Sequence, residues 1–158
     1  MLAIYFLISA VFVGIDQWVK FLVVNQIDYQ ETRNFIPGVL SLTQIHNTGA
    51  AWSIFEGQMW FFFIVTIVAC VVVTYLLIKY QREFWLFPLG LALVLAGALG
   101  NFIDRIRLGY VVDMFQTEFM TFPIFNVADV SLFIGVACIF IYTLFEERLK
   151  GTKHGKSN

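Results

Sequence analysis

Residues 59–78 read MWFFFIVTIVACVVVTYLLI and contain no charged side chain. A membrane-spanning helix needs about 20 consecutive apolar residues to cross the hydrocarbon layer, and this run has that length. Three further runs, at about 2–24, 84–103 and 127–145, meet the same criterion. The pattern therefore predicts an all-α integral membrane protein with four transmembrane helices.

The composition agrees with a lipid environment. Hydrophobic residues make up 59% of the 158 residues and charged residues only 13%, and the mean hydropathy is +0.80. A net charge of -1 gives no indication of a nucleic acid partner. Cys70 and Cys138 lie inside apolar runs without the spacing of a metal or redox motif, so we expect buried thiols. We expect residues 1–158 to form a single membrane-embedded domain.

The basic residues between the spans predict the orientation in the membrane. The short turn at 79–83 and the tail at 146–158 together carry six Lys and Arg residues, and the segments 25–58 and 104–126 together carry three. We therefore expect both termini and the short turn to be cytoplasmic. The two larger segments should be extracytoplasmic.

The first of these larger segments has a pattern that differs from that of the helices. A Pro-Gly pair at 37–38 indicates a turn, residues 39–45 alternate between apolar and polar, and an Asn-Thr-Gly run at 47–49 indicates another turn. We expect a small β-element in this first extracytoplasmic loop. Trp52 suits the headgroup boundary, where aromatic rings settle.

Polar residues at the ends of the apolar spans carry most of the functional information, because a charge in the bilayer is costly unless it is paired or hydrated. Asp16 precedes Lys20 by four residues, so the two share a helix face. A self-contained ion pair and a role in building a site both explain them. Asn101, Asp104 and Arg105 occur together where the third span ends. Arg105 can neutralise a carboxylate or a lipid phosphate.

Two further acids follow along the chain. Asp113 lies within the apolar stretch 110–115, and Asp129 lies in the first turn of the fourth span. An interfacial acid on a short strand would explain Asp113, and a helix capped by Asn126 would explain Asp129. Chemistry is favoured because several acids fall on the same outer membrane face. These acids are Asp16, Asp104, Asp113 and Asp129.

Five sequence blocks together resemble the type II signal peptidase family, the prolipoprotein signal peptidases. The blocks are DQWVK at 16–20, NTGAAW at 47–52, GALGNFIDR at 97–105, VVD at 111–113 and FNVAD at 125–129. Each block alone is weak, but all five in this order on four spans are specific. Ala96 and Met114 depart from the family pattern, which usually has glycine and phenylalanine there, and neither is a charged or amide residue of the site.

The resemblance implies an aspartic endopeptidase with Asp113 and Asp129 as the catalytic dyad. It would cleave the signal peptide from diacylglyceryl-modified prolipoproteins, just before the lipidated cysteine, without a metal or other cofactor. Two carboxyl groups that share a site cannot both ionise cheaply, so one keeps a proton while the other accepts one from water. Sequence alone leaves Asp104 as a rival catalytic acid.

The resemblance also implies roles for the other polar residues. Asn101, Asp104 and Asn126 would position the dyad and the substrate backbone, and Asn47, Asp16 and Arg105 would line the substrate site. The whole set expected to bind substrate or support the site is Asp16, Lys20, Asn47, Gly49, Asn101, Asp104, Arg105, Asn126 and Ala128.

The expected location is the bacterial plasma membrane, with the active site near the outer face. We expect a monomer whose partners are prolipoprotein substrates and membrane lipid, with segment 25–58 able to cover the site as a lid. A small proton-coupled transporter remains an alternative, because intramembrane acids also relay protons. A structural membrane subunit and a lipid transferase are further alternatives.

Overall fold

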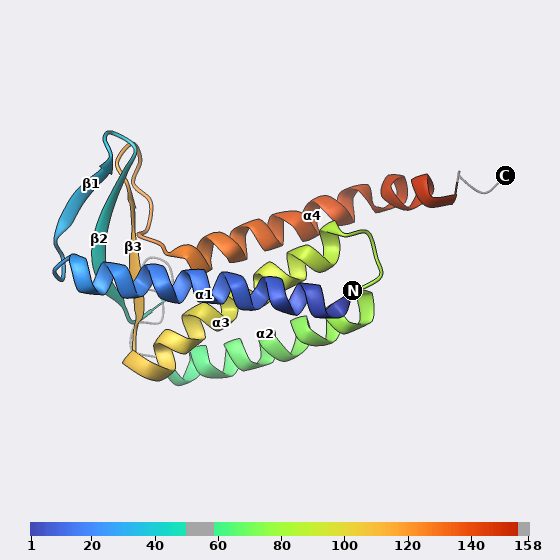
Figure 1. Ribbon diagram of the computed structural model, residues 1–158, viewed down its shortest axis with the longest axis horizontal. Coiled ribbons are helices and arrows are strands. Elements are labelled where there is room, and N and C mark those ends of the chain that lie inside the picture. The colour runs from blue at the N-terminus through green and yellow to red at the C-terminus, as the bar shows by residue number, and fades with distance from the viewer. Residues whose placement is uncertain (50–58, 155–158) are drawn as a thin grey trace.

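The computed structural model describes residues 1–49 and 59–154, and four of its helices are long and apolar enough to cross a membrane. They are α1 (Leu2–Gln26), α2 (Met59–Tyr80), α3 (Leu86–Leu108) and α4 (Val127–His154), as Figure 1 shows. The predicted fold class, a four-helix membrane protein with a small β-element, is confirmed.

Helix α3 forms the centre of the bundle and packs against each of the other three helices. Of its spanning window, 56% is buried, against at most 22% for the other helices, whose exposed aliphatic side chains are left to face lipid. Close contact with α4 depends on glycine at two α3 positions. A Cβ on Gly97 would lie 2.3 Å from the carbonyl oxygen of Ala128, and one on Gly90 would lie 2.7 Å from that of Gly135.

Helix α3 continues to Leu108, past the end that hydropathy indicates at residue 103. It ends at Gly109, which has a left-handed φ of 79° and donates its N–H to the carbonyl of Arg105. Asp104 and Arg105 therefore lie on the last turns of a helix, and their side-chain directions are fixed by the helix.

The β-element is a three-stranded antiparallel sheet in the order β1-β2-β3. Strands β1 (Thr32–Ile36) and β2 (Leu40–Asn47) form a hairpin where the sequence predicts a small β-element, in the first large segment. Strand β3 (Val111–Thr117) comes from the second large segment and pairs with β2, so that Asp113 lies opposite Ile45. The sheet is therefore larger than the sequence indicates.

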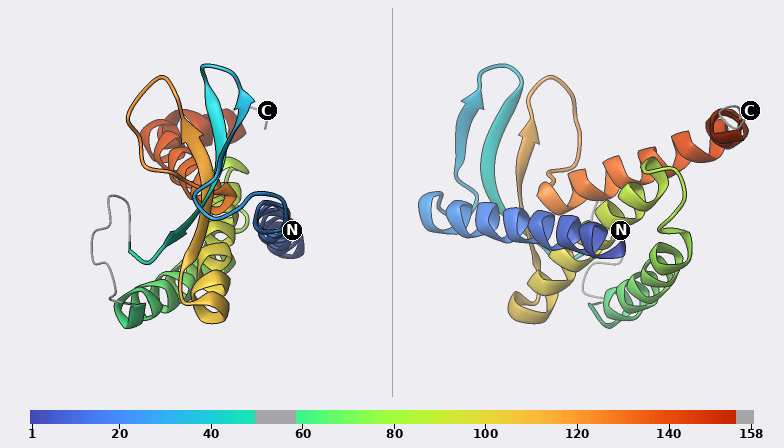
Figure 2. Two further views of the ribbon diagram at one scale, coloured as in Figure 1. Left: turned by 90° about the vertical axis from the view of Figure 1, so that its left-hand side faces the viewer. Right: turned by 45° about the vertical axis from the view of Figure 1, so that its right-hand side comes forward.

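The sheet lies at one end of the bundle, and its strands run across the helix axes (Figure 1; Figure 2, left). After β3 the chain turns back and pairs Phe125 with Phe115 before α4 begins. This return places the start of α4 against β3. The expected contact of Trp52 with the headgroup boundary, and the last part of the expected lid, fall at residues 50–58, outside the described residues.

Candidate active site

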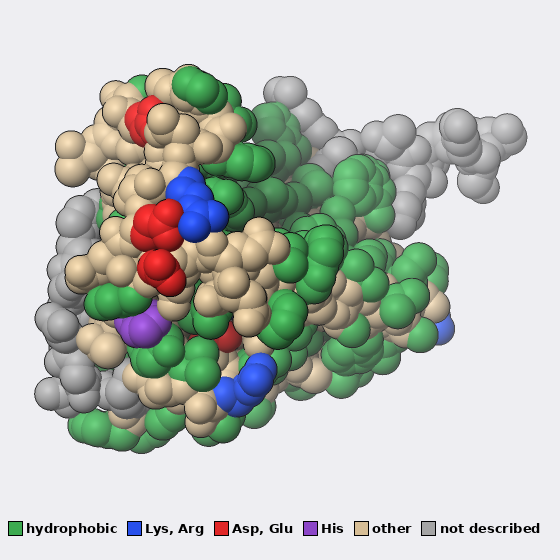
Figure 3. All heavy atoms as spheres, turned by 60° about the vertical axis from the view of Figure 1, so that its left-hand side comes forward, with side chains coloured by type: hydrophobic (Ala, Val, Ile, Leu, Met, Phe, Trp, Pro, Cys, Tyr) green, Lys and Arg blue, Asp and Glu red, His purple; other side chains and the backbone are tan. Residues whose placement is uncertain are grey.

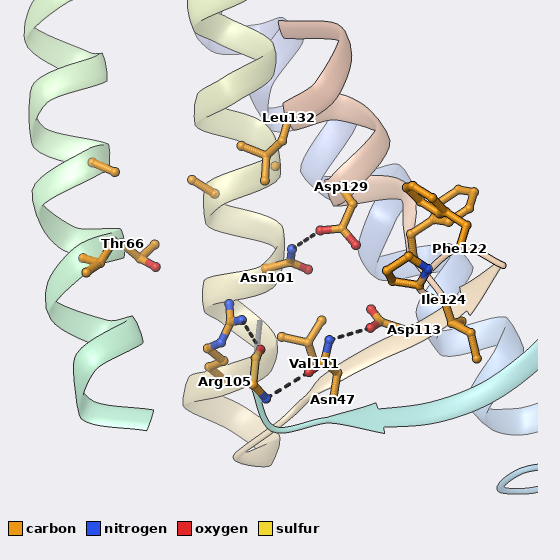
Figure 4. Close-up of a pocket in the computed structure, with 17 residues that line it drawn as sticks. Asn47, Thr66, Asn101, Arg105, Val111, Asp113, Phe122, Ile124, Asp129 and Leu132 are labelled. Carbon is orange, nitrogen blue, oxygen red and sulfur yellow. Dashed lines mark hydrogen bonds between the residues drawn. The ribbon is translucent and has the colours of Figure 1, made fainter. Parts of the chain in front are cut away.

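A cavity of about 470 Å³ lies where the sheet meets the helices. Its polar end is lined by Asn47 of β2, Asn101 of α3, Asp113 of β3 and Asp129 of α4. Figure 4 shows the Asp113 and Asp129 side chains on the same side of this cavity, each bonded to one of the two asparagines. Four elements far apart in the chain therefore bring the two acids to one site.

Asp113 is 3% exposed and is held by two amide groups. Its Oδ1 accepts a hydrogen bond of 2.7 Å from Asn126 Nδ2, and its Oδ2 accepts one of 2.8 Å from Asn47 Nδ2. Burial raises the pKa of this carboxyl to about 7, with a further rise from the charge of Asp129, although the amide bonds and Lys20 act in the opposite direction. The carboxyl can therefore both hold and release a proton near neutral pH.

Asp129 and Asn126 form a reciprocal cap at the start of α4. The Asp129 N–H donates to Asn126 Oδ1 at 2.9 Å, and the Asn126 N–H donates to Asp129 Oδ2 at 3.1 Å. The other carboxyl oxygen of Asp129 accepts from Asn101 Nδ2 at 2.8 Å. The side chain of Asp129 therefore caps α4 and also lines the cavity.

The amide of Asn101 has a defined orientation because its oxygen receives two donors. Lys20 Nζ donates to Asn101 Oδ1 at 3.1 Å, and Asn126 Nδ2 donates to the same oxygen at 3.0 Å. A flipped amide would place its NH₂ against both donors. The nitrogen of Asn101 must therefore point to Asp129.

Lys20 is the centre of a buried ion cluster behind the cavity. Its Nζ lies 2.9 Å from an oxygen of Asp16 and 2.9 Å from an oxygen of Asp104, so with Asn101 its three N–H donors have three acceptors. Asp16 also accepts the backbone N–H of Ala128 at 2.8 Å. Asp16 and Asp104 do not line the cavity. The expectation that Asp16 lines the substrate site therefore does not match its place behind the start of α4.

Arg105 and Gly49 lie at the rim of the cavity. The guanidinium of Arg105 lies over the ring of Phe62, 4.7 Å from its centroid, and Nη2 is 3.4 Å from the carbonyl oxygen of Gly49. The Gly49 N–H in turn donates to Asn47 Oδ1 at 2.9 Å. Among the described residues, the buried Nε of Arg105 has no hydrogen-bond partner.

A family model described as signal peptidase (SPase) II matches residues 8–145. The chain belongs to the signal peptidase II family. It is 60% identical to a lipoprotein signal peptidase of Enterococcus faecalis over 99% of this chain and 96% of that protein, and 48% identical to one of Lactiplantibacillus plantarum over 91% and 96%. Membership of the signal peptidase II family makes the chain a protease of the membrane.

The fold comparison agrees with the signal peptidase II assignment. A bacterial membrane enzyme solved by the in meso method at 2.3 Å resolution has a TM-score of 0.86 and 39% identity, over 99% of this chain and 93% of that chain. A second bacterial membrane enzyme, solved at 1.9 Å, has a TM-score of 0.83 and 40% identity, over 90% and 93%. The four-helix architecture and the sheet are therefore those of solved membrane enzymes.

The sequence analysis did not single out one polar residue beside the candidate site, Gln17. Gln17 Nε2 donates to Asp104 Oδ1 at 2.8 Å, and it lies 3.2 Å from Asp16 Oδ2 and from the Gly100 carbonyl. It therefore links both acids of the ion cluster to the backbone of α3. Its position beside Asp16 in an apolar helix was the available signal, because an uncharged amide there also needs buried partners.

Proposed function

We propose that the chain cleaves the signal peptide from lipoprotein precursors, just before a diacylglyceryl-modified cysteine, with Asp113 and Asp129 as its catalytic pair. The curated relatives named lipoprotein signal peptidase support the substrate class. One observation carries the catalytic assignment. Both carboxyl groups line one cavity, and each of their four oxygens accepts a neutral amide N–H.

The proposed cycle uses one proton shared by the two acids. Asp113, whose pKa is about 7, holds this proton and donates it toward the carbonyl oxygen of the scissile bond. Asp129 is ionised and takes a proton from water while the water oxygen bonds to the carbonyl carbon. When the carbon–nitrogen bond breaks, Asp129 gives its proton to the leaving amine, and the new carboxyl group returns the first proton to Asp113.

The contacts of Asp104 argue against it as a member of the pair. Both of its oxygens are engaged, one by Gln17 and the other by Lys20 and the backbone N–H of Val112. What distinguishes Asp104 is the ammonium of Lys20 at 2.9 Å and its place outside the cavity lining, where no substrate atom would reach it. Asp113 has no such cation and faces the cavity, so it is the better partner for Asp129.

The remainder of the cavity suits a substrate that lies partly in the bilayer. Helices α2 and α4 lie on opposite sides of α3 in Figure 4, and the cavity wall between them is apolar, with Val65, Ala69 and Leu132. An acyl chain or an apolar signal segment can occupy this part while the peptide bond reaches the dyad. The guanidinium of Arg105, which lines the polar end, can donate to a substrate carbonyl there.

The sheet and the dyad are proposed to face the outside of the cell, with both termini in the cytoplasm and the enzyme acting as a monomer. The distribution of basic residues supports this orientation, because the turn and tail carry most of them. Labelling of a cysteine placed at Lys153 tests it. A membrane-impermeant reagent that reached this position in intact cells would contradict the orientation.

The direct test of the function compares two substrates with purified protein. We expect cleavage of a diacylglyceryl-modified precursor peptide and no cleavage of the same peptide without the lipid. Asp113→Asn and Asp129→Asn should each abolish turnover but keep binding of a peptide-like inhibitor, because an amide cannot take a proton from water. Asp28→Asn, a matched change at an exposed acid, should keep full activity. Full activity of either cavity variant would refute the proposed pair.

A further inference from the structure

Six large hydrophobic side chains are exposed at one end of the sheet. This end is opposite to Asn47, the residue of β2 that bonds to Asp113. Each of the six side chains is between 46% and 65% exposed. They come from two segments, the end of β1 with the turn that follows it and the loop between β3 and α4. We call this set the apolar tip: Phe35, Ile36, Val39, Phe119, Met120 and Phe122.

The two segments of the apolar tip are fastened to each other through Glu118. Its backbone N–H donates to the carbonyl of Val39 at 3.0 Å, and its Oε2 accepts the N–H of Gly38 at 2.7 Å. Its Oε1 accepts the hydroxyl of Ser41. The carboxylate is thereby bound to the hairpin, and the two segments form one unit.

The chain around the tip carries almost no charge. Residues 34–45 and 119–128 contain no Asp, Glu, Lys or Arg. The charged side chain of Glu118, which directly precedes the second segment, is bonded to the hairpin. In the space-filling view, charged side chains are concentrated over the middle of this face, and hydrophobic ones appear at its upper end and along the helices (Figure 3). An uncharged, exposed apolar patch of this kind marks a contact surface.

The position of the tip indicates what covers it. The strands run across the helix axes, and their tips extend past the bundle on the side of α1 and α4 in both views (Figure 1; Figure 2, left). The four helices are long and apolar enough to cross a bilayer, so an overhang at their end would face the surface of that bilayer. The loop that carries Phe122 leads into α4, on which Phe133 is 76% exposed.

We propose that the apolar tip inserts into the headgroup region of the leaflet beside α1 and α4, and that this contact fixes the height of the sheet above the bilayer. Aromatic and aliphatic side chains settle at this boundary. Asp113 lies on β3, which ends at Thr117 next to the tip. On the proposed function, the lipid contact therefore holds one catalytic acid at the level where a lipidated substrate presents its peptide bond.

Fluorescence quenching tests the lipid contact without any measurement of activity. In a Cys70→Ala, Cys138→Ala background, single cysteines replace Phe119 or, as the control, Thr32, which is exposed at the opposite end of β1. Each carries an environment-sensitive dye in single-copy nanodiscs of phosphatidylglycerol and phosphatidylcholine. We expect nitroxide lipids with the spin label near the headgroup to quench the Phe119 label several-fold more than the Thr32 label, and iodide to show the reverse order.

Equal iodide quenching of both labels, with no quenching by the nitroxide lipids, would overturn the proposal. Protection of the Phe119 label only in nanodiscs with two copies would overturn it in favour of a contact between copies. A Phe35→Gln, Val39→Gln, Phe119→Gln variant adds a kinetic readout. We expect KM for the lipidated precursor to rise several-fold in nanodiscs with kcat unchanged. If the wild-type protein cleaves no lipidated precursor, the proposed function fails while the quenching result still decides the lipid contact.

Discussion

Replacement of Asp113 by asparagine should change how stability depends on pH, because the carboxyl changes its proton affinity on folding. Its pKa rises from 3.8 to about 7 in the folded protein, mainly through burial. The folded state therefore binds this proton more tightly than the unfolded state does. Stability from this group is present below about pH 4 and is lost as the pH rises to about 7.

The size of the effect follows from the shift. A rise of about 3 pH units corresponds to about 4 kcal/mol of unfolding free energy, at about 1.4 kcal/mol per unit. For a chain of this length that is a change in Tm on the order of 10 °C. Asp113→Asn has no proton to lose, so its stability should lack this part of the decline between pH 4 and pH 7.

Thermal unfolding in detergent micelles at half-unit steps from pH 4 to pH 8 provides the measurement. The difference in Tm between Asp113→Asn and the wild type should move steadily in favour of the variant as the pH rises. Asp28→Asn, at an exposed position, should follow the wild-type curve. Parallel curves for Asp113→Asn and wild type across this range would refute the burial argument.

The same carboxyl predicts that wild-type activity falls as the pH rises through about 7, because the shared proton is lost.

Four further changes separate chemistry, substrate handling and packing. Lys20→Met should destabilise the protein by about 3 to 5 kcal/mol in chemical unfolding, because two buried acids lose their cation. Gly97→Ala should cost about 1 to 3 kcal/mol and reduce kcat, since its Cβ would meet the α4 backbone, whereas Gly14→Ala, with open space around it, should cost neither. Arg105→Ala should raise KM in steady-state assays with little change in Tm. Asp104→Asn should lower Tm yet retain measurable turnover; inactivity of Asp104→Asn together with near-normal cleavage by Asp113→Asn would point to the rival pair.

The parts of the fold that depend on local pattern could be predicted from sequence. Each span follows from an apolar run, and strand β2 follows from the alternation in residues 39–45. Strand β3 joins the sheet through pairing with a segment more than sixty residues away, as in Ile45 with Asp113, and no local pattern encodes that register. The last turn of α3 was also missed, because hydropathy falls at Asp104 while helical hydrogen bonding continues.

The candidate site was predictable as a set of residues but not as an arrangement. The five blocks named its acids and amides, yet only the fold separates Asp113, which faces the cavity, from Asp104, which lies behind it. The two are nine positions apart in the chain, and both occur where apolar sequence meets polar sequence. Their difference comes from the lysine of α1, whose position relative to α3 is a result of helix packing.

The place of Lys20 behind Asn101 explains why amides surround the proposed pair, Asp113 and Asp129. An ammonium bonded directly to a catalytic carboxylate would hold it ionised and remove its ability to carry a proton. Lys20 instead bonds to Asn101, which passes a neutral N–H to Asp129, and Asn126 similarly connects Asn101 to Asp113. The cation thus helps to orient the Asn101 amide, whose oxygen also accepts from Asn126, while its charge stays behind the cavity. The carboxyls keep complete hydrogen bonding when buried, and Asp113 still has a pKa at which it can exchange a proton with a substrate.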